Sequence, residues 1–227
     1  MKITDNVEIL EITDERGTLY PVLVWDDEHV VLIDTGLPGQ IELLTGAVAK
    51  AGFSVEKITD VIITHQDMDH IGCAKTIAGF GAKVYAHKTE APYIQGDKTP
   101  IKIADMEKRL SELNEGERAF YERMKKGAPY FYVHVDYLLN DGEILDFCGG
   151  IQVIHTPGHT PGHMALLLKQ SNCLVAGDAA NIVNGVLSGA NPQYTHDMVE
   201  AQSSFKKIIN HNPSRIFCYH GGCLLLG

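Results

Sequence analysis

The sequence has no hydrophobic run long enough to cross a membrane, and it has few basic residues. The longest apolar stretches fall far short of the roughly 20 residues that a transmembrane helix needs, and the start, MKITDNVEILEIT, lacks the apolar segment of a secretory signal. We therefore expect a cytoplasmic protein with no membrane partner. The net charge is −10, from 29 acidic and 19 basic residues. Such a surface repels polyanions, which argues against a nucleic-acid partner.

Paired cysteines are also missing. The number of cysteines, five, is odd, and no CxxC pair occurs: they stand at Cys73, Cys148, Cys173, Cys218 and Cys223. A disulfide framework is therefore not expected, and we interpret these residues as buried or incidental thiols.

What the sequence does contain is a series of short β-type runs that end in Asp or His. They are VVLIDTG (30–36), VIITHQD (61–67), IQVIHTPGH (151–159), CLVAGD (173–178) and RIFCYHGG (215–222). Helical patterns lie between them at 40–50, 70–79 and 196–210, the last with Thr195 as its expected cap, and a tight turn at 170–172 should join two strands. In layered α/β proteins, loops that leave the strand ends carry the ligand sites.

Residues 88–140 do not follow this pattern. Their charged and aromatic character predicts a mostly helical insertion in a single domain that spans 1–227. We expect the insertion to pack on the main body over the site. Tyr93, Tyr130 and Tyr132 are its candidate substrate contacts, and a separate small core of these aromatics is the alternative.

The stretch THQDMDHIG (64–72) predicts a metal site. His65, Asp67, Asp69 and His70 fall within six positions, and carboxylates and imidazoles crowded together need a cation between them. Two divalent ions fit the number of candidate ligands better than one. Further ligands must come from elsewhere in the chain, and TPGHTPGH, AGD and YHGG offer His159, Asp178 and His220.

The pieces LIDTG, THQDMDHIG, TPGHTPGH, AGD and YHGG, in this order over residues 32–222, resemble the metallo-β-lactamase-fold superfamily of metallo-hydrolases. The resemblance implies an α/β fold, a four-layer αβ/βα sandwich with a dinuclear site on one edge. His65, Asp67 and His159 would bind the first metal, Asp69, His70 and His220 the second, and Asp178 would bridge them. Asp34 and His163 would support these ligands without binding metal.

Asp67 departs from the family pattern. The usual motif is HxHxDH, and this chain has HxDxDH. An oxygen ligand in place of a nitrogen shifts the metal preference from zinc toward iron or manganese. The alternative is that Asp67 points away and the first position is weak or empty. The remaining histidines, His29, His87, His134, His155, His196 and His211, are expected to be surface or core residues.

The resemblance implies a metal-dependent hydrolase that uses a metal-bridging hydroxide to cleave an ester, lactone or thioester of a small molecule. Asp69 and Asp178 are the candidate catalytic carboxylates. Asn181 stands where quorum-quenching lactonases of this family have a tyrosine, so it is a candidate substrate contact. An iron-dependent redox enzyme similar to sulfur dioxygenases, a β-lactamase, a phosphodiesterase and a non-catalytic metal-binding protein remain alternatives. A monomer or homodimer is expected.

Overall fold

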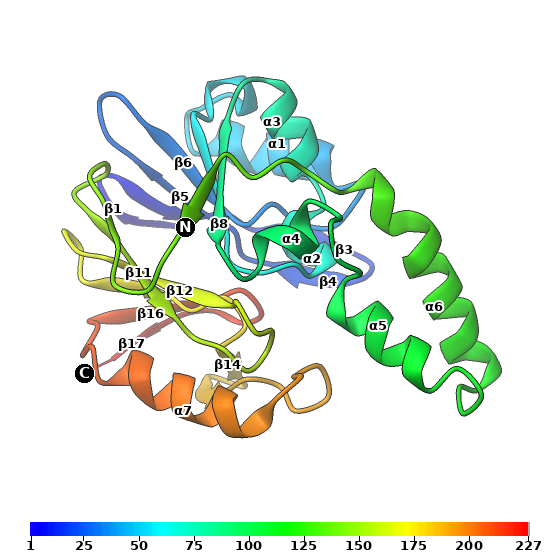
Figure 1. Ribbon diagram of the computed structural model, residues 1–227. Coiled ribbons are helices and arrows are strands. Elements are labelled where there is room, and N and C mark those ends of the chain that lie inside the picture. The colour runs from blue at the N-terminus through cyan, green and yellow to red at the C-terminus, as the bar shows by residue number, and fades with distance from the viewer. Residues whose placement is uncertain (227) are drawn as a thin grey trace.

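The computed structural model describes residues 1–226 and contains two mixed β-sheets stacked face to face, with helices on both outer faces (Figure 1). The predicted four-layer αβ/βα sandwich is confirmed. The first sheet has the order β1-β2-β5-β6-β7-β8-β9. Its strands are Lys2–Thr4 (β1), Val7–Ile9 (β2), Val22–Trp25 (β5), Val30–Ile33 (β6), Asp60–Ile63 (β7), Lys83–His87 (β8) and Tyr137–Leu139 (β9).

The second sheet has the order β10-β11-β12-β13-β16-β17. Its strands are Ile144–Leu145 (β10), Ile151–His155 (β11), Met164–Leu168 (β12), Cys173–Val175 (β13), Arg215–Cys218 (β16) and Gly222–Leu225 (β17). Two hairpins stand apart from the large sheets, Ile12–Asp14 (β3) with Gly17–Leu19 (β4) and Ala180–Val183 (β14) with Val186–Gly189 (β15). The predicted turn at 170–172 joins β12 to β13, as expected.

Helices α1 (Ile41–Lys50) and α3 (Ala74–Gly79) cover the first sheet, and α7 (Met198–Ile209) covers the second (Figure 1). The other helical segments are Val55–Lys57 (η1), Met68–Ile71 (α2), Ala91–Ile94 (α4), Ile101–Lys108 (α5), Glu115–Gly127 (α6) and Ala128–Tyr130 (η2). Within residues 1–226, no helix combines the length and apolar character needed to span a bilayer.

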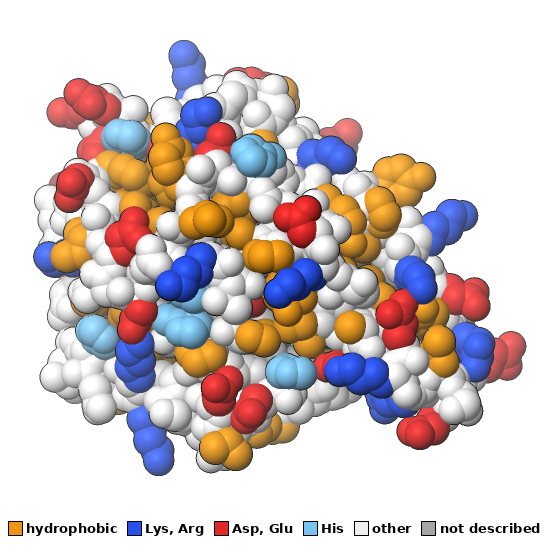
Figure 2. All heavy atoms as spheres, viewed as in Figure 1, with side chains coloured by type: hydrophobic (Ala, Val, Ile, Leu, Met, Phe, Trp, Pro, Cys, Tyr) orange, Lys and Arg blue, Asp and Glu red, His pale blue; other side chains and the backbone are white. Residues whose placement is uncertain are grey.

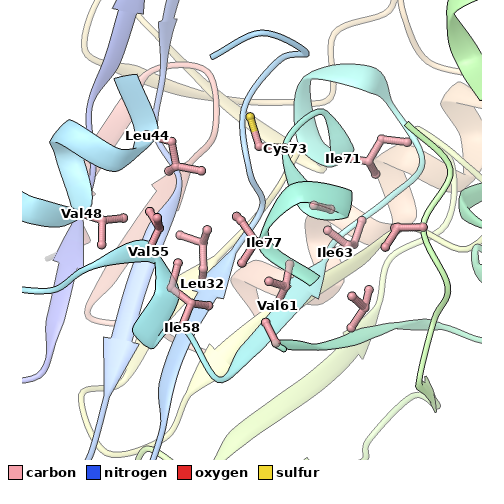
Figure 3. Packing of buried hydrophobic residues seen from close by; sticks show 14 of the residues in the cluster. Leu32, Leu44, Val48, Val55, Ile58, Val61, Ile63, Ile71, Cys73 and Ile77 are labelled. Carbon is pink, nitrogen blue, oxygen red and sulfur yellow. The ribbon is translucent and has the colours of Figure 1, made fainter. Parts of the chain in front are cut away.

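The central strands are buried on both faces. In β6 and β7, Leu32 and Val61 pack against Leu44 and Ile77 beneath the helices (Figure 3). Their neighbours along each strand point the other way, into the core between the two sheets. This two-sided burial explains why the runs are continuously apolar rather than alternating.

Strand direction brings the predicted site residues to one edge. β6, β7 and β8 are parallel, as are β13 and β16 of the other sheet. Parallel strands end at the same edge of their sheet. Asp34 and His65 therefore leave the first sheet together, and Asp178 and His220 leave the second.

Two helix predictions need correction. The predicted helix 70–79 is divided into α2 and α3, because Thr35 binds the backbone at the break. The His70 carbonyl accepts bonds from the Thr35 backbone N (2.8 Å) and Oγ1 (2.8 Å), so it cannot continue a helical ladder. At the start of α7, Asp197 rather than Thr195 is the cap, since its side chain accepts bonds from Val199 N and Glu200 N.

The predicted insertion contains α4, α5 and α6, but its last residues form β9 and pair with β8 in the main sheet. Helices α5 and α6 stand out from the side of the body (Figure 1) and carry acidic and basic side chains on their exposed surface (Figure 2). They share a small apolar cluster that includes Ile103, Tyr121 and Met124, with Met68 of α2 and Tyr132 packed against it. Most members of this cluster are aliphatic rather than aromatic, and of the three candidate tyrosines Tyr132 packs against it.

Candidate metal centre

Loops from both sheets bring seven histidine and aspartate side chains to one edge of the sandwich. The segment after β7 supplies four of them, and the segments after β11, β13 and β16 supply one each. Potential ligand atoms lie within 4.8 Å of one another in three groups: His65, Asp67 and His159; His65, His70 and Asp178; and Asp69, His70 and His220. The structure therefore brings together all seven residues that the sequence predicts as ligands.

Asp178 lies between the two predicted metal positions. Its Oδ2 atom is 3.5 Å from His159 Nε2. Its Oδ1 atom is 3.5 Å from the Nε2 atoms of both His70 and His220. One oxygen of the carboxylate thus faces each position, which is the arrangement that a bridging carboxylate needs.

The other two carboxylates each serve one position. Asp67 Oδ2 lies 2.9 Å from His159 Nε2 and 3.2 Å from His65 Nε2. Asp69 Oδ2 lies 3.1 Å from His220 Nε2. The alternative in which Asp67 points away from the histidines is therefore not the arrangement found.

Asp34 and Thr64 set the orientation of two imidazoles. Asp34 Oδ2 lies 2.8 Å from His70 Nδ1 and accepts a bond from Thr64 Oγ1 (2.8 Å). Because the Thr64 hydroxyl group donates its proton to Asp34, the hydroxyl oxygen accepts a hydrogen bond from His65 Nδ1 at 3.1 Å. With Nδ1 held in this way, both rings direct their Nε2 atoms into the centre. Asp34 itself has a φ of 59°, which is uncommon for a residue other than glycine.

His163 supports the backbone of Asp178. Its Nε2 atom accepts a bond from Asp178 N (3.0 Å), and its Nδ1 atom lies 2.8 Å from Thr156 Oγ1. Gly177 makes this approach possible, since a Cβ atom there would lie 2.7 Å from His163 Nε2 and its φ is +52°. His163 lies outside the three groups, in keeping with the predicted supporting role.

The buried carboxylates remain ionised. Burial opposes ionisation of Asp67, but the charge of Lys102, together with the contacts to His65 and His159, outweighs it and holds the Asp67 pKa well below its usual value. Burial likewise opposes ionisation of Asp178, and the charge of His70 keeps its pKa well below normal. Burial and the nearby His70 charge lower the pKa of His65 to about 4, so this ring is neutral at neutral pH and its lone pair is available.

Three buried polar atoms of the centre lack hydrogen-bond partners among the described residues: His65 Nε2, His70 Nε2 and Asp178 Oδ1. Leaving one buried polar atom unpaired costs about 1–3 kcal/mol. All three belong to the same group of potential ligand atoms, and a divalent cation would satisfy them together. The residues present therefore fit divalent metals.

A family model described as the metallo-beta-lactamase superfamily matches residues 19–220, which include the whole centre. The chain belongs to the metallo-beta-lactamase superfamily. Members of this superfamily bind divalent metals and are mostly metal-dependent hydrolases.

Two curated relatives and one solved structure illustrate the similarity. The probable metallo-hydrolase YflN of Bacillus subtilis is 27% identical, with 92% of this chain and 82% of YflN covered. The hydroxyacylglutathione hydrolase GloC of Haemophilus influenzae is 25% identical, with 76% of this chain and 71% of GloC covered. The structure of the metallo-beta-lactamase family protein TTHA1429 from Thermus thermophilus superimposes with a TM-score of 0.78. The two sequences are 24% identical, and the match covers 99% of this chain and 76% of TTHA1429.

In this metallo-beta-lactamase superfamily member, a cavity of about 450 Å³ opens over the centre. It is lined by Asp69, Lys102, Asp178, Asn181, Asn191, Tyr194 and His220. Asn181, a candidate substrate contact, lies in the wall of this cavity. Within residues 1–226, the walls of this cavity do not include Tyr93, Tyr130 or Tyr132. Tyr130 is 72% exposed, and Tyr132 packs against the α5–α6 cluster.

Sequence reasoning missed Glu90, which ties the metal-binding loops together. This buried carboxylate accepts bonds from Gln66 N (2.9 Å) and Nε2 (3.0 Å), and from Gly162 N (2.8 Å). Gln66 adjoins Asp67, and Gly162 lies in the loop of His159. No local pattern marks Glu90, because its partners are distant in the sequence.

Thr195 and Lys102 were missed for the same reason. Thr195 Oγ1 donates to Asn191 O (2.7 Å) and lies 3.4 Å from His159 Nδ1, where it supports the ring. Lys102, in the first turn of α5, places its ammonium 2.5 Å from Asp67 Oδ2. The insertion thus contributes to the centre through a cation, whereas the sequence had indicated its aromatic residues.

Proposed function

We propose that this protein is a dinuclear metal-dependent hydrolase that cleaves an ester, lactone or thioester of a small molecule. The observation that carries the proposal is the position of Asp178, whose two carboxylate oxygens face two separate groups of imidazole and carboxylate ligands. The name of the relative GloC, a hydroxyacylglutathione hydrolase, supports hydrolytic chemistry.

Divalent ions bound in these groups would activate water and polarise the carbonyl oxygen of the substrate. The residues around them orient the reaction. Asp69 and Asp178 line the cavity as ionised carboxylates, so either can accept the proton that the attacking water loses. The amides of Asn181 and Asn191 lie in the cavity wall and can donate hydrogen bonds to the substrate.

A second, larger cavity adjoins the first. It has a volume of about 930 Å³, lies between the β14–β15 hairpin and α7, and shares Asn181, Asn191 and His220 with the cavity over the centre. Much of its lining is apolar: Ile182, Val183, Ala190, Pro192, Met198 and Phe205. We propose that it binds the apolar acyl or alkyl part of the substrate, because pockets of this size and lining bury small ligands.

A substrate panel with metal analysis tests this function. Protein purified without air is analysed for metal per chain and then assayed on matched esters, lactones, thioesters, a phosphodiester and a β-lactam. We expect two metals per chain, cleavage of at least one of the first three classes, and loss of that cleavage in Asp178→Asn. Two bound metals without cleavage of any substrate would contradict the proposal.

An iron-dependent redox reaction is the second candidate, because the Asp67 carboxylate faces the first position and oxygen ligands favour iron or manganese over zinc. Oxygen consumption with a thiol or persulfide substrate, in place of hydrolysis, would favour this candidate.

A further inference from the structure

Lys102 occupies an unusual place at the centre. Its ammonium lies 2.5 Å from Asp67 Oδ2. The same oxygen lies 2.9 Å from His159 Nε2 and 3.2 Å from His65 Nε2. Lys102 therefore shares the carboxylate oxygen that faces both imidazoles of the first metal position.

The neighbouring backbone fixes Lys102 in this place. Ile101 N donates to Gln66 Oε1 at 2.8 Å, and Gln66 is in turn held by the buried carboxylate of Glu90. The first turn of α5 is thus attached to the residue next to Asp67. An exposed lysine that merely forms an ion pair with a nearby carboxylate would not need its backbone held by such hydrogen bonds.

The Lys102 side chain also has room to move. It is 34% exposed and lines the cavity over the centre. Its ammonium lies 5.4 Å from the centroid of the Tyr194 ring, within the range of a cation–π contact. The ammonium can therefore leave Asp67 and remain at the cavity mouth beside Tyr194.

The two metal positions differ in whether a lysine pairs with their carboxylate. Asp69, the carboxylate of the second position, forms ion pairs with His70 and His220, and among the described residues no lysine or arginine lies within 4.0 Å of it. At the first position, an ammonium on Asp67 uses a lone pair that a metal would need and repels a divalent ion.

We propose that Lys102 competes with a divalent ion for Asp67 and so makes the first metal position weaker than the second. Metal binding at the first position requires the ammonium to leave Asp67 Oδ2. This inference rests on the proposed dinuclear centre, and it assigns to α5 of the insertion a direct influence on how many metals the chain holds.

Metal binding tests the competition without an activity assay. Metal-free protein is titrated with Mn²⁺ by equilibrium dialysis and metal analysis, and the two dissociation constants are compared in wild type, Lys102→Met and Lys102→Arg. We expect Lys102→Met to tighten the weaker constant at least tenfold and to leave the stronger one unchanged, while Lys102→Arg, which keeps the charge, resembles wild type. Lys108→Met is the matched control, because Lys108 lies on the same helix and pairs with the exposed Asp105.

Equal constants in wild type and Lys102→Met would overturn the role of Lys102 and leave the dinuclear centre standing. No Mn²⁺ binding in any of the proteins would overturn the centre and the competition together. If Lys102→Met does not fold, Lys102→Gln provides the neutral variant for the same comparison.

Discussion

At the scale of single residues, the centre depends on oxygen atoms that hold the Nδ1 side of three imidazoles, those of His65, His70 and His159. Asp34 binds His70 Nδ1 at 2.8 Å and also accepts two bonds from Thr64. A carboxylate in this position fixes the ring and makes it a stronger ligand. The sequence pattern LIDTG marks this residue, but the bond itself joins two separate strand ends.

We predict that Asp34→Asn weakens metal binding by about 10–100-fold, since an amide cannot accept all the bonds that the carboxylate accepts. Metal dissociation constants measure the effect. Asp60→Asn is the control, because Asp60 pairs with His29 at 2.8 Å, outside the metal groups. Equal weakening in both variants would mean that the effect is one of general stability.

Asp67 is the residue that should decide metal identity. We predict that Asp67→His keeps the fold and shifts the metal content toward zinc, because nitrogen replaces a hard oxygen ligand. Metal analysis of both proteins from identical cultures measures the shift. Unchanged ratios of zinc to iron and manganese would show that Asp67 does not select the metal.

His87 should make the metal-free fold sensitive to acid. Burial and the charge of His155 lower the His87 pKa to about 4, whereas an unfolded histidine titrates near 6.5. Between these values the unfolded chain binds more protons, so the contribution of His87 to stability is complete above about pH 6.5 and is lost as the pH falls toward 4.

We predict that His87→Gln flattens the dependence of the unfolding free energy on pH in this window, by up to about 1.4 kcal/mol per pH unit. Urea denaturation with a chelator at several pH values measures the slope. The exposed His134, changed to Gln, is the control. An unchanged slope in His87→Gln would contradict the prediction.

At the scale of elements, the break between α2 and α3 positions His70. At the break, Gly72 lies against another backbone segment. A Cβ atom on Gly72 would be 2.2 Å from Pro38 N, and Gly72 N donates to Gly36 O at 2.9 Å. This close approach holds the segment after β6 beside the segment after β7.

We predict that Gly72→Ala destabilises the protein by about 2 kcal/mol or more, because the two backbones must separate. Gly79→Ala is a matched control at the end of α3, where a Cβ atom meets nothing within 4 Å. The control should be neutral or more stable by up to about 1 kcal/mol. Urea unfolding of the two variants provides the comparison, and equal stabilities would refute the steric argument.

At the scale of the whole molecule, the centre joins the two halves of the sandwich. Four of its seven side chains follow β7 of the first sheet, and three come from loops of the second. A metal that binds the folded chain but not the unfolded chain raises the free energy of unfolding by about 2.7 kcal/mol when the metal concentration is a hundred times its dissociation constant.

We predict that a chelator lowers the midpoint of thermal unfolding by about 5–10 °C, as expected for a chain of this size. Calorimetry with and without the chelator measures the shift, and Asp178→Asn, which removes one carboxylate oxygen from the centre, should show a smaller one. A midpoint that stays constant while metal analysis shows complete removal would contradict a centre that links the sheets.

The sequence by itself determined the layered fold and the seven clustered side chains. Each predicted ligand stands within a few residues of the end of an apolar run, and such runs form buried strands because their side chains leave water. Because His65 and Asp178 follow the ends of their strands by only a few residues, the short loops restrict where these side chains can lie. These are local properties, so the sequence motifs mark the candidate ligands, and the resemblance of these motifs to the superfamily implies the layered fold.

Only the tertiary structure decided what surrounds those side chains. Glu90 links two loops, Thr195 supports His159 instead of capping a helix, and Lys102 reaches Asp67 from the insertion, whose tyrosines are the residues that the sequence indicates. The division of the predicted helix 70–79 has a similar origin, in bonds from Thr35. Each contact joins residues far apart in the chain, and the free energy that selects it arises when the two sheets and the insertion pack together, so no local pattern of residues encodes it.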